Sequence, residues 1–205
     1  MSSNQIAERV FQELREARAK GDGYVSENAL AHRLGLGRPQ LREILARIDL
    51  FGRIEKKQKF GIRLRPWDGS TLQVVLDLRG MLEGYVSERL SGKLSEDDFA
   101  ALEFHARMYE QGFQGGDGAM MAAHDLEFHQ LLIDRAELPL LNRIFEQLNL
   151  LEMSLFGVEP RTKAIAGAQH NPIRHADIVA ALRRSAAEGA AMLRRHIQWQ
   201  YTFQC

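Results

Sequence analysis

The pattern of apolar positions in the first fifty residues predicts three short helices. The first is expected over residues 4–19, where one helical stripe consists of Ile6, Val10, Leu14 and Ala17. A second helix follows Ser26, a residue type that favours the N-cap, and ends at Gly35; a third begins near Arg38. Two short helices joined by a glycine-containing turn are typical of a helix-turn-helix.

A β-hairpin is predicted directly after these helices. The segments 53–55 and 62–64 alternate apolar and polar residues, as short strands do. The expected tip between them carries Lys56, Lys57, Lys59 and Gly61. The pattern therefore indicates a basic β-wing.

The remaining chain shows helical spacing throughout. Pro66 to Gly69 forms the expected linker, because proline and Asp-Gly both favour turns. Helices are expected near 70–91, 96–112, 118–135, 138–156, 173–188 and 190–203, with a short one around 160–168. The predicted fold class is mainly α, with three parts: a winged helix-turn-helix at 1–65, the linker at 66–69, and an antiparallel helical bundle at 70–205.

Composition narrows the class of protein further. No run of eighteen apolar residues occurs, and the segment MSSNQIAERV lacks the apolar core of a signal peptide. The single cysteine, Cys205, excludes an internal disulfide and a thiolate zinc cluster. We therefore expect a cytoplasmic protein without a membrane partner.

The zero net charge hides an asymmetry between the two predicted domains. Residues 1–65 carry 14 Lys and Arg against 8 Asp and Glu, whereas the rest of the chain carries 13 against 19. A basic module attached to an acidic one suits a nucleic-acid reader, because neutralised phosphates supply much of the affinity for DNA. Chance asymmetry on two solvated surfaces is the alternative.

Residues suited to reading DNA begin the third predicted helix, which would enter the major groove. Arginine can donate two hydrogen bonds to guanine, and glutamine can pair with adenine in the same way. The predicted DNA-binding residues are Arg33, Arg38, Gln40, Arg42, Lys56, Lys57, Lys59 and Gly61. The lysines would contact phosphates, and Gly61 would let the wing approach DNA closely. Alternatively, these are solvated helix residues and a solubilising turn.

Residues 30–45, LAHRLGLGRPQLREIL, resemble the winged-helix signature LAxxLGVSRTPVREAL of GntR-type bacterial regulators. Gly37 replaces the serine of that pattern, and Pro39 and Gln40 replace its Thr-Pro. The loss of a capping serine leaves the fold intact but allows a different operator sequence. The resemblance implies binding to a double-stranded DNA operator.

A second set of polar residues interrupts apolar helix faces in the bundle. Asp125 and His129 are four residues apart and share a face with Met121, Phe128, Leu132 and Ala136. His175 and His196 likewise lie on apolar stripes of two later helices. Three imidazoles and one carboxylate suit zinc, nickel, iron or manganese better than calcium or magnesium, and zinc is expected in isolated protein. Taken singly, each histidine could be an ordinary core or surface residue.

This histidine pattern resembles the FadR C-terminal (FCD) domain, which accompanies the winged helix in one GntR branch. In many members, Asp and His on one helix and single histidines on two later helices hold a metal at the floor of an effector cavity. Asp125, His129, His175 and His196 match those positions, whereas His32, His105, His124 and His170 do not. The resemblance also implies dimerisation through this domain.

Arg79 and Glu83 interrupt the apolar face of the helix predicted at 70–91. One interpretation is an ion pair at the rim of that face. The other is that Arg79 binds the carboxylate of an effector, as a similarly placed arginine in FCD domains suggests.

The combined patterns predict a homodimeric bacterial transcription regulator, a repressor rather than an activator. Its effector would be a small molecule, expected to be an organic acid. One rival is a metalloenzyme that activates water, but Glu127, the nearest candidate base, projects from the opposite side of the helix to the ligands. The other rival is a regulator whose metal is structural or is itself the signal.

Overall fold

A computed structural model describes residues 3–49, 52–65, 69–156 and 172–199 of the chain. Contacts divide the chain into two units, one made of Met1–Asp68 with Asn149–Gly157 and the other of Gly69–Leu148 with Val158–Cys205.

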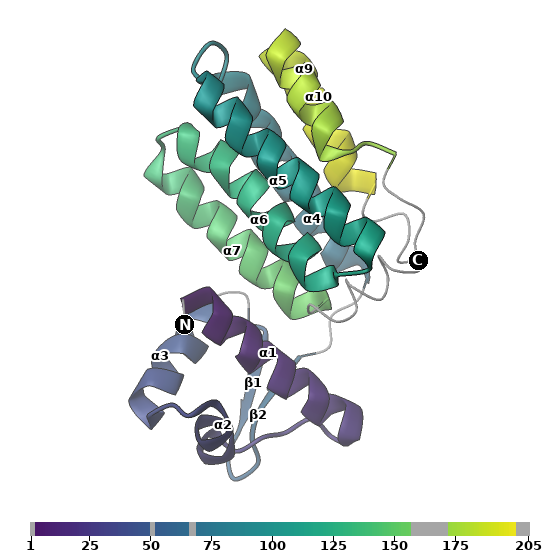
Figure 1. Ribbon diagram of the computed structural model, residues 1–205. Helices are drawn as coiled ribbons and strands as arrows, with labels where there is room; N and C mark the ends of the chain where they lie inside the picture. The colour runs from purple at the N-terminus through teal and green to yellow at the C-terminus, as the bar shows by residue number, and fades with distance from the viewer. Residues whose placement is uncertain (1–2, 50–51, 66–68, 157–171, 200–205) are drawn as a thin grey trace. The chain divides into compact units, whose positions relative to one another are not determined.

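The first unit contains three helices and a hairpin, namely α1 (Ser3–Lys20), α2 (Glu27–Leu34), α3 (Arg38–Ile48), β1 (Ile54–Lys57) and β2 (Gly61–Leu64) (Figure 1). The strands pair antiparallel, with Ile54 opposite Leu64 and Lys57 opposite Gly61. The predicted helix-turn-helix and wing are therefore confirmed. The fully buried side chains at the centre of this unit include Val10, Phe11, Leu14, Leu30, Leu41, Leu45 and Ile62.

Local capping explains why α2 occupies its observed span. Ser26 accepts a hydrogen bond from the backbone N–H of Ala29 at 3.1 Å, as an N-cap residue does. Gly35 ends the helix in the left-handed conformation, with φ of 66°. Gly37 begins α3 without a side-chain cap, and Pro39 lies in its first turn.

The wing depends on a glycine for a structural reason that the sequence analysis did not identify. Gly61 has a φ of 111°, and a Cβ atom there would lie 2.2 Å from the carbonyl oxygen of Val25. The close approach arises because Val25 forms a β-bridge with Ile62. Gly61 is thus needed to hold the hairpin against the segment before α2, whether or not it also approaches DNA.

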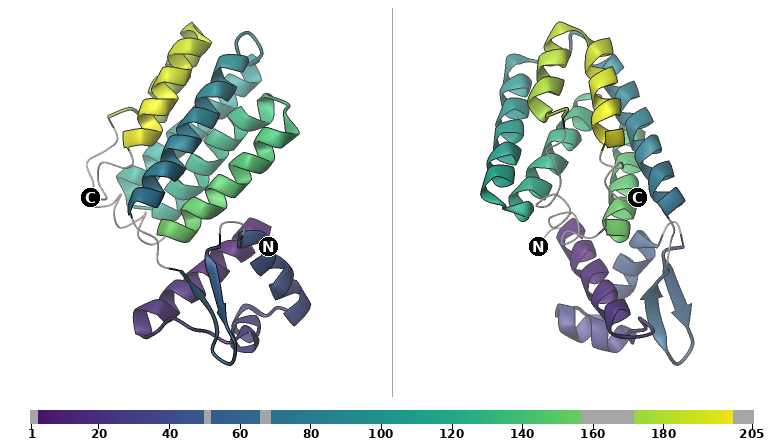
Figure 2. Two further views of the ribbon diagram at one scale, coloured as in Figure 1. Left: turned by 180° about the vertical axis from the view of Figure 1, so that it is seen from behind. Right: turned by 90° about the vertical axis from the view of Figure 1, so that its right-hand side faces the viewer.

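The second unit is a bundle of helices, as predicted. Its described members are α4 (Gly69–Arg89), α5 (Glu96–Gly115), α6 (Gly118–Arg135), α7 (Pro139–Phe156), α9 (His175–Arg184) and α10 (Ala186–Trp199). The part of α7 from Asn149 onward is assigned to the first unit. Figures 1 and 2 show them side by side, with α5 next to α6 and α10 next to both α4 and α9. The described residues contain no helix long and apolar enough to cross a membrane.

Helix ends and close contacts in the bundle follow from the local sequence. Ser95 and Asp98 form a reciprocal capping box at the start of α5. Gly84 lets α10 approach α4, because a Cβ atom at that position would lie 2.3 Å from Nε of Arg194. The mainly apolar core includes Val86, Leu102, Phe128, Leu132, Ile178 and Leu193.

One predicted helix boundary was wrong by several residues. We expected the last two helices to meet near residue 189, but the break occurs at Ser185, whose side chain accepts a hydrogen bond from the N–H of Glu188 at 3.2 Å. Gly189 instead lies inside α10, where a Cβ atom would be 2.4 Å from Leu182. The helix predicted at 160–168, the linker residues 66–68 and the predicted helix end beyond residue 199 lie outside the described residues.

Candidate metal centre

Four polar residues from three helices come together inside the bundle. Asp125 and His129 project from one face of α6, His175 is the first residue of α9, and His196 lies in α10. Each offers one ligand atom, and these atoms all lie within 4.8 Å of one another. None of the four residues is more than 4% exposed. The predicted ligand set therefore forms one buried cluster.

The donor atoms in this cluster fit a transition metal. Nε2 of His129 is buried and has no hydrogen-bond partner among the described residues, an arrangement that is costly unless something binds there. Asp125 Oδ1 lies 3.8 Å from that nitrogen and 3.2 Å from Nε2 of His175. Three imidazole nitrogens and one carboxylate oxygen match the ligands that zinc and its neighbours prefer.

The surroundings of the cluster favour the neutral, metal-binding form of two histidines. Burial lowers the pKa of His175, and the charge of Asp125 only partly offsets this effect. Burial, reinforced by His175 and His129, holds the pKa of His196 well below its usual value. Both rings are therefore neutral near pH 7, and a neutral imidazole has the lone pair that a metal requires.

Hydrogen bonds orient two of the three imidazoles. Nδ1 of His196 donates to the carbonyl oxygen of Ile173 at 2.7 Å. Nδ1 of His129 forms a short contact with Oε2 of Glu83, a residue of α4. In both rings Nε2 is left as the nitrogen available to a metal.

Arg79 and Glu83 form a buried pair and not one at the rim of the helix. Each is 1% exposed, and Nε of Arg79 donates to Oε1 of Glu83 at 2.6 Å. Both residues stand out in the sequence, but the contact between Glu83 and His129 does not. The interrupted apolar stripe was the signal that pointed to this pair.

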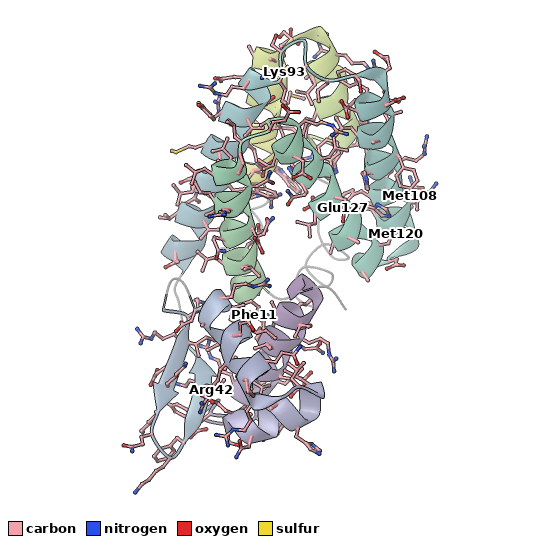
Figure 3. The ribbon with its side chains drawn as sticks, turned by 90° about the vertical axis from the view of Figure 1, so that its left-hand side faces the viewer. Phe11, Arg42, Lys93, Met108, Met120 and Glu127 are labelled. Atoms are coloured by element: carbon pink, nitrogen blue, oxygen red, sulfur yellow. The ribbon has the colours of Figure 1, made fainter. Side chains whose placement is uncertain are left out.

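The other histidines lie apart from the cluster, as expected. Nδ1 atoms of His105 and His124 face each other at 3.0 Å between α5 and α6. His32 is exposed, and His170 lies outside the described residues. Glu127 is exposed on α6 and does not join the cluster (Figure 3).

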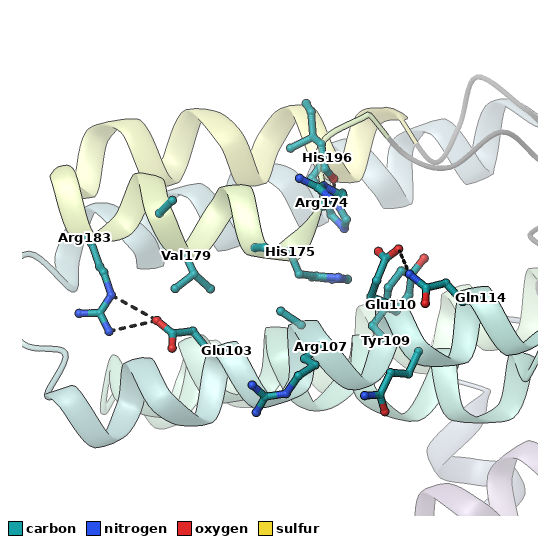
Figure 4. Close-up of a pocket in the computed structure, with 15 residues that line it drawn as sticks. Glu103, Arg107, Tyr109, Glu110, Gln114, Arg174, His175, Val179, Arg183 and His196 are labelled. Carbon is teal, nitrogen blue, oxygen red and sulfur yellow. Dashed lines mark hydrogen bonds and ion pairs between the residues drawn. The ribbon is translucent and has the colours of Figure 1, made fainter.

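A cavity of about 640 Å³ lies beside the cluster, between α5 and α9 (Figure 4). His175 and His196 form part of its wall, and the ring of Tyr109 packs edge-on against His175 with centroids 4.7 Å apart. Charged side chains also line it, including Arg107, Glu110, Arg174 and Arg183. Its volume is within the range of small-molecule sites. Arg79 is not among the residues that line this cavity.

The predicted DNA-binding residues occupy α2, α3 and the wing. Arg38, Gln40 and Arg42 are exposed on α3, and the label in Figure 3 marks Arg42. Nε of Arg42 lies 2.9 Å from Oε2 of Glu27, and Arg33 makes a similar contact at 3.0 Å with Glu13. The wing lysines Lys56, Lys57 and Lys59 are exposed, and Nζ of Lys57 lies 4.3 Å from the ring centroid of Phe60.

Comparison with known proteins identifies the family. The family model of the FCD domain matches residues 74–198, more than half of the chain. The chain therefore belongs to the FCD-domain family, and with its winged helix it is a GntR-type transcription regulator. No curated protein matches it.

Solved structures share the fold at low sequence identity. Escherichia coli McbR/YncC aligns with a TM-score of 0.73 and 16% identity over 98% of this chain and 93% of its own. Streptococcus agalactiae GntR aligns with a TM-score of 0.50 and 19% identity over 98% and 100% of the two chains. Lar, described as controlling expression of the Listeria monocytogenes agr system, aligns with a TM-score of 0.51 and 16% identity over 96% of each of the two chains.

Zinc should stabilise the protein through the four clustered residues. At a free zinc concentration about 100 times the Kd, binding adds about 2.7 kcal/mol to the free energy of unfolding. We expect zinc to raise the thermal midpoint of the chelator-treated wild type but to have much less effect on His196→Ala. The exposed His32→Ala is the matched control and should behave as wild type. If His196→Ala binds stoichiometric zinc and zinc raises its thermal midpoint as much as that of the wild type, His196 is not a ligand.

Proposed function

We propose that the protein is a homodimeric regulator, acting as a repressor, whose operator binding responds to a metal-bound organic acid. Residues 1–65 would bind DNA, 66–69 would link the domains, and 70–205 would bind the effector and dimerise. The observation that carries the proposal is the buried Asp125, His129, His175 and His196 cluster beside a cavity, in a chain that also has a winged helix.

The DNA-binding role rests on exposed residues at the start of α3. Arg38, Gln40 and Arg42 are available at the N-terminal end of the helix that enters the groove in this motif. Arg42 contacts Glu27 in the absence of DNA. Exposed ion pairs contribute little stability, so this contact can be exchanged for base or phosphate contacts.

Loss of Arg42 should reduce sequence discrimination. A two-pronged arginine–guanine contact is worth roughly 1–3 kcal/mol, or about 5- to 150-fold in relative affinity. We expect Arg42→Ala to lose preference of this order for DNA flanking its gene over scrambled DNA, measured by fluorescence anisotropy across a salt series. Lys20→Ala removes a charge from the end of α1 and should keep the preference. Equal discrimination in Arg42→Ala and wild type would exclude the role of Arg42.

The charges around the cluster support an anionic effector. Asp125, Glu83 and Arg79 are all buried, and with a divalent ion they carry one net positive charge. A carboxylate entering from the adjacent cavity would neutralise that charge in a site shielded from water. Binding of the effector by Arg79 remains a prediction, because the Nε of this arginine donates to Glu83.

Binding of a carboxylate effector should depend on the bound metal. We expect at least one member of a panel of small carboxylic acids to raise the thermal midpoint of zinc-loaded protein and to change its affinity for DNA. The effect should disappear with chelator and with the corresponding neutral amide. If zinc alone changes DNA affinity and no acid adds to it, the metal is the signal. If zinc stabilises the chain but neither zinc nor any acid changes DNA affinity, the metal is structural.

The outer face of α4 supports dimerisation with a second copy of the chain. Val74, Leu78, Met81 and Tyr85 form one stripe at helical spacing, and each is at least 42% exposed. The opposite face of α4 is buried within the bundle and carries the apolar Val75, Leu76 and Val86 as well as Arg79 and Glu83. The outer stripe therefore needs a separate partner. Two DNA-reading wings on two half-sites also require two chains.

A charge on this stripe should separate the two copies. We expect Met81→Glu to convert a wild-type dimer into a monomer at micromolar concentration in sedimentation analysis, because two carboxylates would be desolvated in one interface. Ala100→Glu, on the exposed side of α5, should leave the dimer intact. A Met81→Glu dimer as stable as wild type would place the interface elsewhere.

A further inference from the structure

Glu83 makes two contacts that link the metal centre to a different helix. Its Oε1 accepts a hydrogen bond from Nε of Arg79 at 2.6 Å, one turn earlier in α4. Its Oε2 meets Nδ1 of His129, which lies 46 residues further along the chain in α6. The Glu83 side chain is fully buried, so both carboxylate oxygens are used without exposure to solvent.

The negative charge of Glu83 is maintained despite this burial. Nε of Arg79 lies 2.6 Å from Oε1 of Glu83, and both side chains are shielded from solvent. Arg79 is equally buried and supplies the positive charge that a carboxylate in this position requires. The pair is therefore a fixed anion beside the histidine.

An ionised carboxylate determines which nitrogen of His129 carries the proton. A carboxylate only accepts hydrogen bonds, so Nδ1 of His129 must donate, and in the neutral imidazole Nε2 then has the lone pair. Nε2 is also the nitrogen that has no hydrogen-bond partner among the described residues. His196 is oriented in the same way, but by the neutral carbonyl of Ile173.

We propose that Glu83 is a positioning residue for the metal centre: it fixes the tautomer and ring orientation of His129, while Arg79 serves as its counter-ion. This inference rests on the proposed metal site. A charged acceptor also makes the imidazole a stronger electron donor than a carbonyl does, which strengthens its bond to a metal. In this role Arg79 acts on the metal centre through Glu83.

Three variants on α4 separate this role from simple packing. Glu83→Leu removes the acceptor, whereas Glu83→Gln keeps an acceptor oxygen for Nδ1 but loses the charge that Arg79 neutralises. Glu88→Gln makes the same chemical change at an exposed residue of the same helix, one that contacts Arg194 at 2.9 Å. Zinc affinity is measured in the full chain by competition with a chromophoric chelator, and Co²⁺ absorption reports ligand geometry.

We expect zinc affinity to fall about 10- to 100-fold in Glu83→Leu, the range for residues that support metal ligands. Glu83→Gln should show a smaller loss, and Glu88→Gln none. The Co²⁺ spectrum should change in Glu83→Leu but not in Glu88→Gln. Long-range ¹H–¹⁵N spectra of metal-free protein, assigned with His129→Gln, should show protonated Nδ1 in the wild type and a tautomer mixture in Glu83→Leu.

Three outcomes would overturn the inference. If folded Glu83→Leu binds zinc like wild type with the same Co²⁺ spectrum, Glu83 does not position His129. If Glu83→Leu fails to fold, Glu83→Gln is the deciding variant. A zinc affinity of Glu83→Gln equal to that of Glu88→Gln would then exclude the positioning role of Glu83. If the wild type binds neither zinc nor Co²⁺, the proposed metal site itself is wrong. The first two outcomes, in contrast, would leave the metal site intact.

Discussion

The second unit depends on the burial of six ionisable side chains within a helical bundle. Arg79, Glu83, Asp125, His129, His175 and His196 are each at most 4% exposed. A buried charge or polar group without a partner is costly, so each member needs a partner in a defined position. The cluster is held by directional contacts between side chains on different helices. It therefore constrains how α4, α6, α9 and α10 pack together.

The two faces of helix α4 carry different parts of the proposed machinery. Its inner face carries Glu83, which contacts a candidate metal ligand, and its outer face carries the apolar stripe around Met81. A change in the metal centre that moved Glu83 would move a rigid helix and, with it, the proposed dimer contact. Coupling between sites requires such an element with two arrangements, and α4 is the part of the bundle that touches both.

Much of the fold and the candidate ligand set could be predicted from the sequence because the signals are local. Asp125 and His129 are four residues apart, so helix geometry alone places them on one face. The contact between Glu83 and His129 could not be predicted, because it depends on how α4 packs against α6 over 46 residues of chain. The cavity between α5 and α9 likewise depends on helix packing. Gly61 was noticed, but its structural role requires knowing that Val25 lies against it.

The chain contains ion pairs of two kinds, exposed and buried. Arg33 and Arg42 are paired with carboxylates at the surface, where water and salt reduce each pair to about 0–1 kcal/mol. As proposed DNA-binding residues, these arginines could exchange such pairs for contacts to DNA at little cost. The pair between Arg79 and Glu83 is shielded from solvent, so breaking it would leave a charge without compensation. Exchangeable pairs suit a surface that must bind and release a polyanion, whereas a fixed pair suits a site that must hold a histidine in one orientation.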